Sequence, residues 1–378
     1  MHKFDAIRFF HDTEINDVLQ KAIHHPMVKT MMNFTFPGMP DEEWKAQLSK
    51  THSIRDFQCN FIYHTVKKVL EKSSEGLSSS GFEKLEDGEA YLFISNHRDI
   101  LLDTTLLNTC LFEHNLVMTA SAIGNNLVKK PFLHTLAMLN RNFLVMRDLS
   151  PREMLQSSKL LSEYIYHLLH RETRSVWIAQ REGRTKDGND QTNPGLLKMI
   201  GMGSDEADLT TYFKKLRIVP VSISYEYDPT DAMKMPQLIA EANNEVYVKN
   251  RNEDFMNIVG GAMGPKKRIH IHIGDVLDTA IDKIAAENDN ANKQIQALAQ
   301  VIDDSIIQNY HLWPTNFIAY DIREKENRFA HKYTEAERQL FERRMEMRID
   351  TTNEIAVNGF LAMYANPVVN RLKYTDEL

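Results

Sequence analysis

The pattern of apolar and polar positions divides the chain into two helical ends and a central region rich in strands. Up to about residue 72, apolar residues recur at helical spacing, and the Gly- and Pro-containing residues 36–40 interrupt that pattern. Serine and glycine dominate residues 73–81, which predicts a polar linker. The pattern therefore predicts an N-terminal helical segment over residues 1–80.

Short apolar runs from residue 81 to about residue 275 predict buried strands separated by helices. The last of them, residues 268–274, alternates isoleucine with His270 and His272, so the histidines should share the face opposite the isoleucines. The fold class predicted for residues 81–275 is α/β, with a mixed sheet of about six or seven strands covered by helices.

Residues 276–378 again show helical periodicity and form the predicted C-terminal helical segment. An apolar stripe runs from Ile295 to Ile306, and Trp313-Pro314 ends it. A charged helix should follow from Thr334 to about Ala365, with its charge-dense middle, residues 342–348, exposed to solvent.

Composition narrows the class of protein. The 378 residues include only two cysteines, Cys59 and Cys110, which favours a reducing compartment over a disulfide framework. The N-terminus lacks a signal-peptide profile, and no window of 18 apolar residues predicts a transmembrane helix. We therefore expect a cytoplasmic location. A net charge of −7 gives no support for nucleic-acid binding.

The charge of the central region differs from that of the whole chain. Residues 124–220 contain 15 Lys and Arg against 10 Asp and Glu, a local excess of five positive charges that would suit an anionic substrate. Lys186 belongs to this group, and Arg147 and Arg184 follow predicted strands. An arginine fork binds phosphate with better geometry than a lysine does.

The segment from Tyr91 to Asp103 carries the clearest chemistry. A buried strand leads into Ser95-Asn96, which we expect to cap a following helix, and His97 then stands at the strand-to-helix turn. A histidine beside a carboxylate is the minimal general-base pair, because the carboxylate fixes the tautomer and the free ring nitrogen takes a proton. The alternative is a structural histidine at a helix start.

Three later segments also join an apolar strand to a polar end. They are residues 124–147, which close with Arg147; residues 176–188, which contain Arg181-Glu182-Gly183-Arg184; and residues 218–226, which contain Val219-Pro220-Val221. Together with the first segment, they resemble the four motifs of the glycerolipid acyltransferases, the enzymes that acylate glycerol-3-phosphate and lysophosphatidate. The resemblance covers roughly residues 81–275.

The resemblance implies a role for each motif. His97 would be the general base on an acceptor hydroxyl, and Asp103 would orient it. Arg147 and Arg184 would bind phosphate, with Asn96, Glu182, Gly183 and Pro220 shaping the site. Acyl-CoA or acyl-carrier protein would supply the acyl group, and the reaction would need neither a metal nor another cofactor.

Two departures from the family pattern affect the geometry. Five residues separate His97 from Asp103, where the family has four, so Asp99 is the alternative partner. Arg184 also stands one residue earlier than usual, which makes Arg181 a candidate to share its role. A non-catalytic lipid-binding relative would show similar departures.

A lipid acceptor without a transmembrane helix implies peripheral contact with the inner face of a membrane. An apolar N-terminal cluster offers a docking surface, although the same residues would also suit a core: Met27, Met31, Met32, Phe34, Phe36 and Met39. Two further alternatives stay open, namely O-acylation of an acyl-amino-acid lipid and hydrolysis of a thioester.

Overall fold

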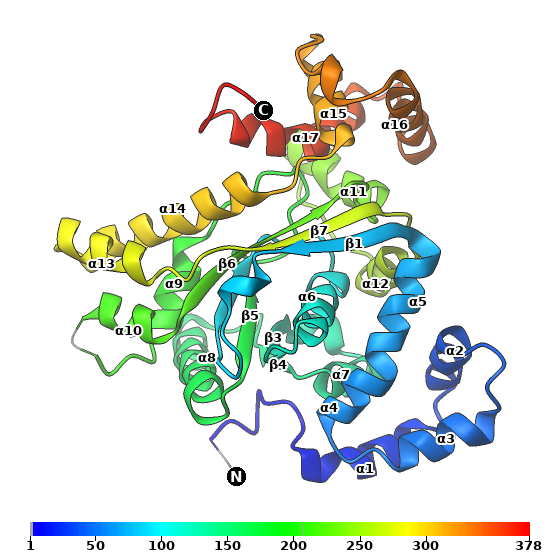
Figure 1. Ribbon diagram of the computed structural model, residues 1–378, viewed down its shortest axis with the longest axis vertical. Coiled ribbons are helices and arrows are strands. Elements are labelled where there is room, and N and C mark those ends of the chain that lie inside the picture. The colour runs from blue at the N-terminus through cyan, green and yellow to red at the C-terminus, as the bar shows by residue number, and fades with distance from the viewer. Residues whose placement is uncertain (1–2, 207) are drawn as a thin grey trace.

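One mixed β-sheet forms the centre of the protein (Figure 1). The computed structural model describes residues 3–206 and 208–378. Within these residues, the sheet has seven strands in the order β1-β7-β6-β2-β5-β3-β4, and only the β6–β7 pair is antiparallel. The strands are β1 (Ser74–Ser80), β2 (Leu92–Ser95), β3 (Thr119–Gly124), β4 (Asn142–Val145), β5 (Ser175–Ala179), β6 (Ile218–Tyr225) and β7 (Lys267–Ile273). The predicted α/β class is confirmed.

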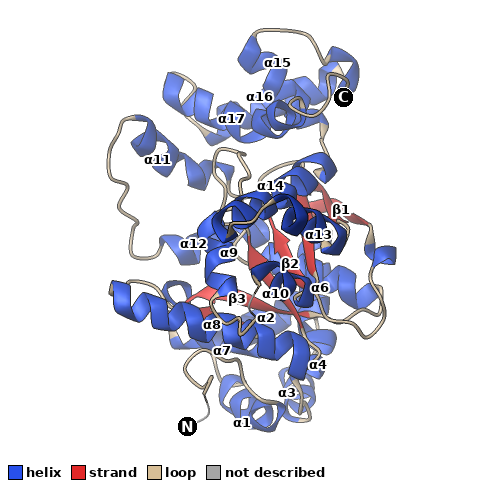
Figure 2. Ribbon diagram, turned by 90° about the vertical axis from the view of Figure 1, so that its left-hand side faces the viewer, coloured by secondary structure: helices blue, strands red, loops and turns tan. Residues whose placement is uncertain are grey.

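Helices cover both faces of this sheet, as the two views show (Figures 1 and 2). The N-terminal helices are α1 (Asp12–Ala22), α2 (Pro26–Thr35), α3 (Asp41–Ser49), α4 (Ile54–Phe57) and α5 (Tyr63–Ser73). Those between the strands are α6 (Leu102–Glu113), α7 (Pro131–Leu139), α8 (Pro151–Arg171), α9 (Pro194–Gly201), α10 (Leu209–Lys215), α11 (Asp231–Ala242) and α12 (Glu253–Met263). The C-terminal helices are α13 (Asp278–Glu287), α14 (Ala291–Asn309), α15 (Pro314–Glu324), α16 (Glu335–Arg348) and α17 (Glu354–Arg371).

The strands face two separate hydrophobic cores because successive side chains point to opposite sides of a sheet. Leu92 and Ile94 of β2 enter the core that contains α8 and α14, whereas Phe93 enters the core that contains α5 and α6. Continuous apolar runs therefore mark the central strands, since both of their faces are buried.

The predicted polar linker at residues 73–81 is wrong, because residues 74–80 form edge strand β1. This strand pairs in parallel with β7, and its Ser78 and Ser80 hydroxyls bond the rings of His270 and His272. An edge strand gains its backbone hydrogen bonds from one neighbour and needs no apolar face, so its serine-rich sequence carries little strand signal.

The single C-terminal helix expected over residues 334–365 is also wrong. A turn at residues 350–353 separates α16 from α17, because Asp350 accepts from Thr352 N and Asn353 caps α17. The charge-dense middle is only partly exposed, since Arg344 is buried and bonds Asp231. Sequence periodicity could not show this pairing between residues more than 100 positions apart.

The N-terminal apolar cluster is mostly core. Met32 is 1% exposed, and Met31, Phe34, Phe36 and Met39 pack against the two cores. Met27 is exposed to 39%. Of the two alternatives left open by the sequence, these contacts support the core over the docking surface. None of the described helices is both long and apolar enough to cross a membrane. The three predicted segment boundaries stay a prediction.

Replacement of Asp231 should destabilise the fold strongly. Its fully buried carboxylate accepts from Arg344 at 2.7 Å, Arg348 at 2.8 Å and Tyr364 at 3.0 Å, which joins α16 and α17 to α11. Asp231→Ala leaves Arg344 buried without its counter-charge, which costs about 3–5 kcal/mol. Urea denaturation measures the loss. Glu287→Ala, which opens the exposed 3.9 Å pair with Lys283, is the control and should change stability by less than ~0.5 kcal/mol.

Candidate active site

The loop between β2 and α6 places His97 at the carboxyl end of the parallel strands. β2 ends at Ser95, and α6 begins at Leu102. The expected cap at Ser95-Asn96 is wrong: Asp99 Oδ1 accepts from the backbone N–H groups of Leu101 and Leu102. The longer loop absorbs the extra residue of the motif before the helix starts.

Asp103 contacts the histidine ring. Its Oδ2 lies 2.8 Å from His97 Nδ1 and accepts from the amides of Arg98 and Asp99 at 2.6 and 3.1 Å. Its Oδ1 accepts from the Tyr225 hydroxyl at 2.7 Å. Because the carboxylate acts as an acceptor, Nδ1 donates its proton to Asp103, and Nε2 is the ring nitrogen that this contact leaves free.

Asp99 occupies a different position. Its Oδ2 is buried without a hydrogen-bond partner among the described residues, and it packs against Gly261 of α12 so closely that a Cβ there would lie 1.9 Å from it. Burial, and then the charge of Asp103, raise the pKa of Asp99. The carboxylate that touches His97 is thus that of Asp103.

A buried network fixes the backbone on either side of His97. Asn96 exchanges two hydrogen bonds with the backbone of Ile223 in β6, at 2.8 and 3.0 Å. Arg98 donates to Asp190 at 2.5 Å, and Asp190 accepts from Thr185, whose N–H donates to the His97 carbonyl at 2.8 Å. The loop after β5 therefore holds the loop after β2.

His97 opens into a cavity of about 620 Å³, which is the size of a small-molecule site. The cavity wall includes the predicted residues Arg147, Arg181, Glu182, Gly183 and Arg184. The structure thus brings together motifs that are far apart in the sequence. Pro220 lies deeper, in β6 opposite Ile94, and is not part of that wall.

The arginines have different partners. Arg147 pairs with Glu182 at 2.7 Å, and Arg184 donates to Thr230 at 3.1 Å. Arg181 Nε is buried without a hydrogen-bond partner in the described part of the chain. Gly183 adopts a left-handed φ of 73°, which lets the loop turn between Glu182 and Arg184.

Sequence reasoning counted Lys186 among the basic residues of the central region without giving it a role in the site, and it missed the cavity residues of α11 and α12. Lys186 Nζ bonds only the Arg184 carbonyl, at 3.3 Å, among the contacts described, and burial together with Arg184 lowers its pKa to about 8. Lys234 of α11 is fully buried against Asp228. Lys186 lies only two residues after Arg184, so the motif around Arg184 could have indicated Lys186 as a site residue. No motif pointed to α11 or α12.

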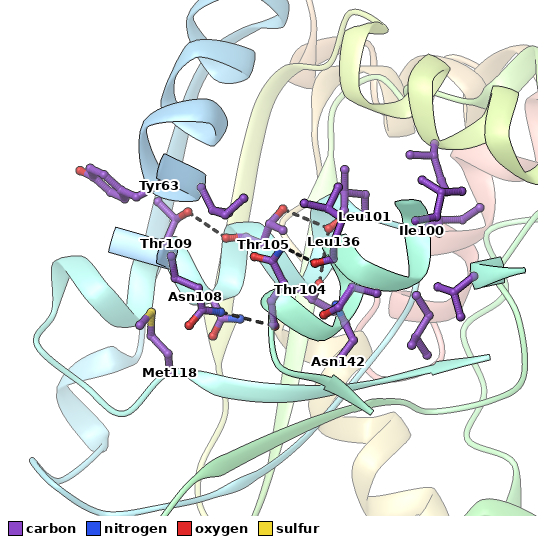
Figure 3. A pocket seen from close by; sticks show the side chains of 18 of the residues that line it. Tyr63, Ile100, Leu101, Thr104, Thr105, Asn108, Thr109, Met118, Leu136 and Asn142 are labelled. Atoms are coloured by element: carbon purple, nitrogen blue, oxygen red, sulfur yellow. Dashed lines mark hydrogen bonds between the residues drawn. The ribbon is translucent and has the colours of Figure 1, made fainter. Parts of the chain in front are cut away.

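A second, apolar cavity of about 100 Å³ runs beside α6 (Figure 3). Five residues line both cavities: Ile100, Thr104, Ile123, Leu127 and Asn142. Thr105 and Thr109 direct their hydroxyls to carbonyls of their own helix, at 3.0 and 2.8 Å, so their methyl groups are left for the cavity. An apolar chamber thus adjoins the polar cavity near His97.

Comparison with known proteins gives a family match for the central part of the chain. Residues 77–224 match the Acyltransferase family. The match covers less than half of the 378 residues and coincides with the central part of the chain. All of the site residues predicted from the sequence lie within the matched range, whereas the α11 and α12 walls of the polar cavity lie beyond it.

The other two comparisons, with curated sequences and with solved structures, identify no family for the chain. No curated protein sequence matches the chain. Among solved structures, this chain is similar to the 1-acyl-sn-glycerophosphate (LPA) acyltransferase PlsC from Thermotoga maritima. The sequence identity is 12%, the match covers 78% of this chain and 94% of that chain, and the TM-score is 0.36.

Lys186 should titrate near neutral pH. Its folded pKa of about 8 is below the ordinary 10.5, and Arg184, Glu241, Lys234 and Arg181 are the charged groups that act on it. Below pH 8 the folded state bears the full cost of the buried ammonium. Stability then rises as the pH climbs from about 8 to 10.5, where the unfolded chain binds more protons.

Lys186→Met should therefore raise the free energy of unfolding at pH 7, and the gain should disappear by about pH 10.5. Lys283→Met is the control, since Lys283 is 74% exposed, and it should show no such dependence. An NMR titration of the lysine side chains measures the midpoint directly. A Lys186 midpoint near 10.5 would contradict the assignment.

Proposed function

We propose that this protein transfers a fatty acyl group from a thioester to a hydroxyl group of glycerol-3-phosphate or lysophosphatidate. The observation that carries the proposal is the position of His97, beside the residues shared by a polar cavity and an apolar one. A reaction between a fatty acyl thioester and an anionic alcohol needs both environments at one catalytic base.

The His97–Asp103 pair can perform the transfer without a covalent enzyme intermediate. Nε2 of His97 removes the proton from the acceptor hydroxyl as its oxygen attacks the thioester carbonyl carbon. The tetrahedral intermediate then collapses, the carbon–sulfur bond breaks, and the imidazolium returns the proton to the leaving thiolate. Asp103 stabilises the imidazolium, and Tyr225 and two backbone amides hold Asp103 in place.

The apolar cavity suits the fatty acyl chain. It follows α6 from Thr104 to Phe112, which spans about 12 Å along the helix at the usual rise per residue. Its Thr105 and Thr109 hydroxyls are already bonded to the helix backbone, so hydrocarbon can contact their methyl groups without leaving them unpaired.

The polar cavity suits the anionic end of the acceptor. Arg147, Arg184 and Lys186 line it, and Arg181 adds a further donor. Phosphate would compete with Glu182 for Arg147, whereas Arg184 keeps only the neutral Thr230 as its hydrogen-bond partner among those described. Backbone N–H groups near Gly183, which lines the same wall, would stabilise the oxyanion.

Acyl-CoA or acyl-carrier protein would supply the thioester, and the inner face of a membrane would supply the lipid. The two free thiols, Cys59 and Cys110, are consistent with a reducing compartment. An acyl-amino-acid lipid is the alternative acceptor. The ion pair between Arg147 and Glu182 favours this alternative, because Glu182 already occupies the guanidinium group that would otherwise bind a phosphate.

Substitution of the catalytic pair tests the chemistry. His97→Ala should lower the transfer rate by ~10²–10⁴-fold, the usual loss for a general base. Asp103→Asn should come close to that loss, whereas Asp99→Asn should cost less than about tenfold, because Asp99 caps α6 instead of touching the ring. The assay follows acyl transfer from acyl-CoA, with circular dichroism as the folding control.

Folded His97→Ala protein with normal activity would exclude this mechanism. A larger loss from Asp99→Asn than from Asp103→Asn would assign the partner role to Asp99. Thioester hydrolysis without any transfer, across glycerol-3-phosphate, lysophosphatidate and lyso-amino-acid lipids, would identify a hydrolase. Acyl-chain binding without turnover would indicate a non-catalytic relative.

Substitution of the arginines tests the acceptor. Arg147→Ala or Arg184→Ala should remove a charge-assisted contact worth about 1.5–3 kcal/mol, which is roughly a 10- to 100-fold rise in the KM of a phosphorylated acceptor. The KM of the acyl donor should stay within about twofold. Arg171→Ala, at the exposed end of α8, is the matched control. Equal effects on donor and acceptor would refute the phosphate assignment.

A further inference from the structure

Exposed large apolar side chains gather beside the mouth of the polar cavity. Of the fifteen such residues in the described chain, eight lie in residues 146–155 and 246–263, which we call the mouth rim: Met146, Met154, Leu155, Val246, Val248, Met256, Val259 and Met263. Val246 and Val248 are 90% and 79% exposed. Such a concentration marks an interaction surface more often than chance exposure does.

Both segments that carry the mouth rim contribute residues to the wall of the polar cavity. Met146 and Met154 line it from the end of β4 and the start of α8, and Lys249, Glu253 and Asp254 line it from the α11–α12 loop and the start of α12. Figure 2 shows that loop projecting on the same side of the molecule as one end of α8.

Helix α12 connects this surface to the apolar cavity. Its Ile258 lines the apolar cavity, whereas Met256, Val259 and Met263 recur at steps of three and four and form an outward stripe. Gly261 packs on Asp99 beside the catalytic loop. The exposed stripe and the wall of the apolar cavity are thus two sides of one helix.

Basic residues stand among these apolar ones. The exposed cations in and next to the mouth rim are Lys129, Lys130, Arg152, Lys249 and Arg251. Acidic residues lie in the same segments: Lys249 pairs with Asp254 at 2.8 Å, and Asp148, Glu153 and Glu253 are close in sequence. Lys130 bonds Asn252 at 3.3 Å and lies over the Phe255 ring, which places the start of α7 beside α12. None of the described ion pairs includes Lys129, Lys130, Arg152 or Arg251, so these four side chains can contact anionic lipid headgroups beside the protruding apolar ones.

We propose that the mouth rim docks on a lipid bilayer, with Val246 and Val248 inserted among the headgroups. A protein partner seated on this face would close the cavity mouth, whereas a bilayer would deliver an amphipathic substrate through it. The proposal rests on the proposed function for the identity of that substrate.

The test measures binding of the full chain to vesicles of phosphatidylcholine, with and without phosphatidylglycerol. Val246→Asp/Val248→Asp should weaken binding by roughly tenfold or more, because two apolar side chains that enter the interface become charged. The matched control is Leu340→Asp/Met347→Asp on α16, whose side chains are 52% and 70% exposed. It carries the same added charge away from the mouth (Figure 2) and should bind like the wild type.

A tryptophan reporter gives an independent readout. Trp44, Trp177 and Trp313 are all buried, so Val248→Trp should add an exposed fluorophore whose emission shifts to the blue with vesicles. Leu340→Trp should not shift. No vesicle binding by the wild type, equal losses in both double variants, or self-association that only Val246→Asp/Val248→Asp abolishes would overturn the proposal.

An assay of acyl transfer without vesicles tests the proposed function separately from the docking surface. Transfer from a short-chain acyl-CoA to glycerol-3-phosphate, without vesicles, should be equal in the wild type and in Val246→Asp/Val248→Asp, since neither valine lines a cavity. Vesicle binding that depends on the valines, without transfer to any acceptor, would refute the proposed function and support the docking surface.

Discussion

The hydrogen bonds of the Asp103 carboxylate are the constraint on which the site depends. One oxygen holds His97 and the amides of its loop, and the other holds Tyr225 of β6. A fully buried carboxylate is costly unless its lone pairs are used, and here each oxygen has a donor. The loop, the first turn of α6 and the end of β6 are therefore fixed relative to one another, and His97 has a single defined tautomer.

The sheet makes this arrangement possible. β2 lies between β5 and β6, so the loops that follow these three strands meet at one edge. Asn96 binds the backbone of β6, and Arg98 reaches Asp190 in the loop after β5. Arginines from the loops after β4 and β5 then face the same cavity as the histidine. Parallel strands concentrate polar side chains at their carboxyl ends, which is where open α/β sheets bind ligands.

The parts of the chain beyond the family match complete the cavity. α11 contributes Lys234 and a wall near Arg184, and the C-terminal helices hold α11 through the buried Asp231. α12 separates the apolar cavity from the surface at the mouth rim. The C-terminal segment thus supports the polar cavity through α11, although none of its described residues lines either cavity.

The sequence by itself determined the α/β class, the central strands and the candidate residues of the site, because apolar periodicity and short motifs are local properties. It failed at β1, whose serines gain stability only from pairing with β7, and at Arg344, whose charge is buried only because Asp231 meets it. It also left the choice between Asp99 and Asp103 open. Tertiary structure decided that choice, since the start of α6 and the packing of Asp99 against Gly261 direct only Asp103 toward the ring. Contacts between distant segments set such outcomes, and no local pattern records them.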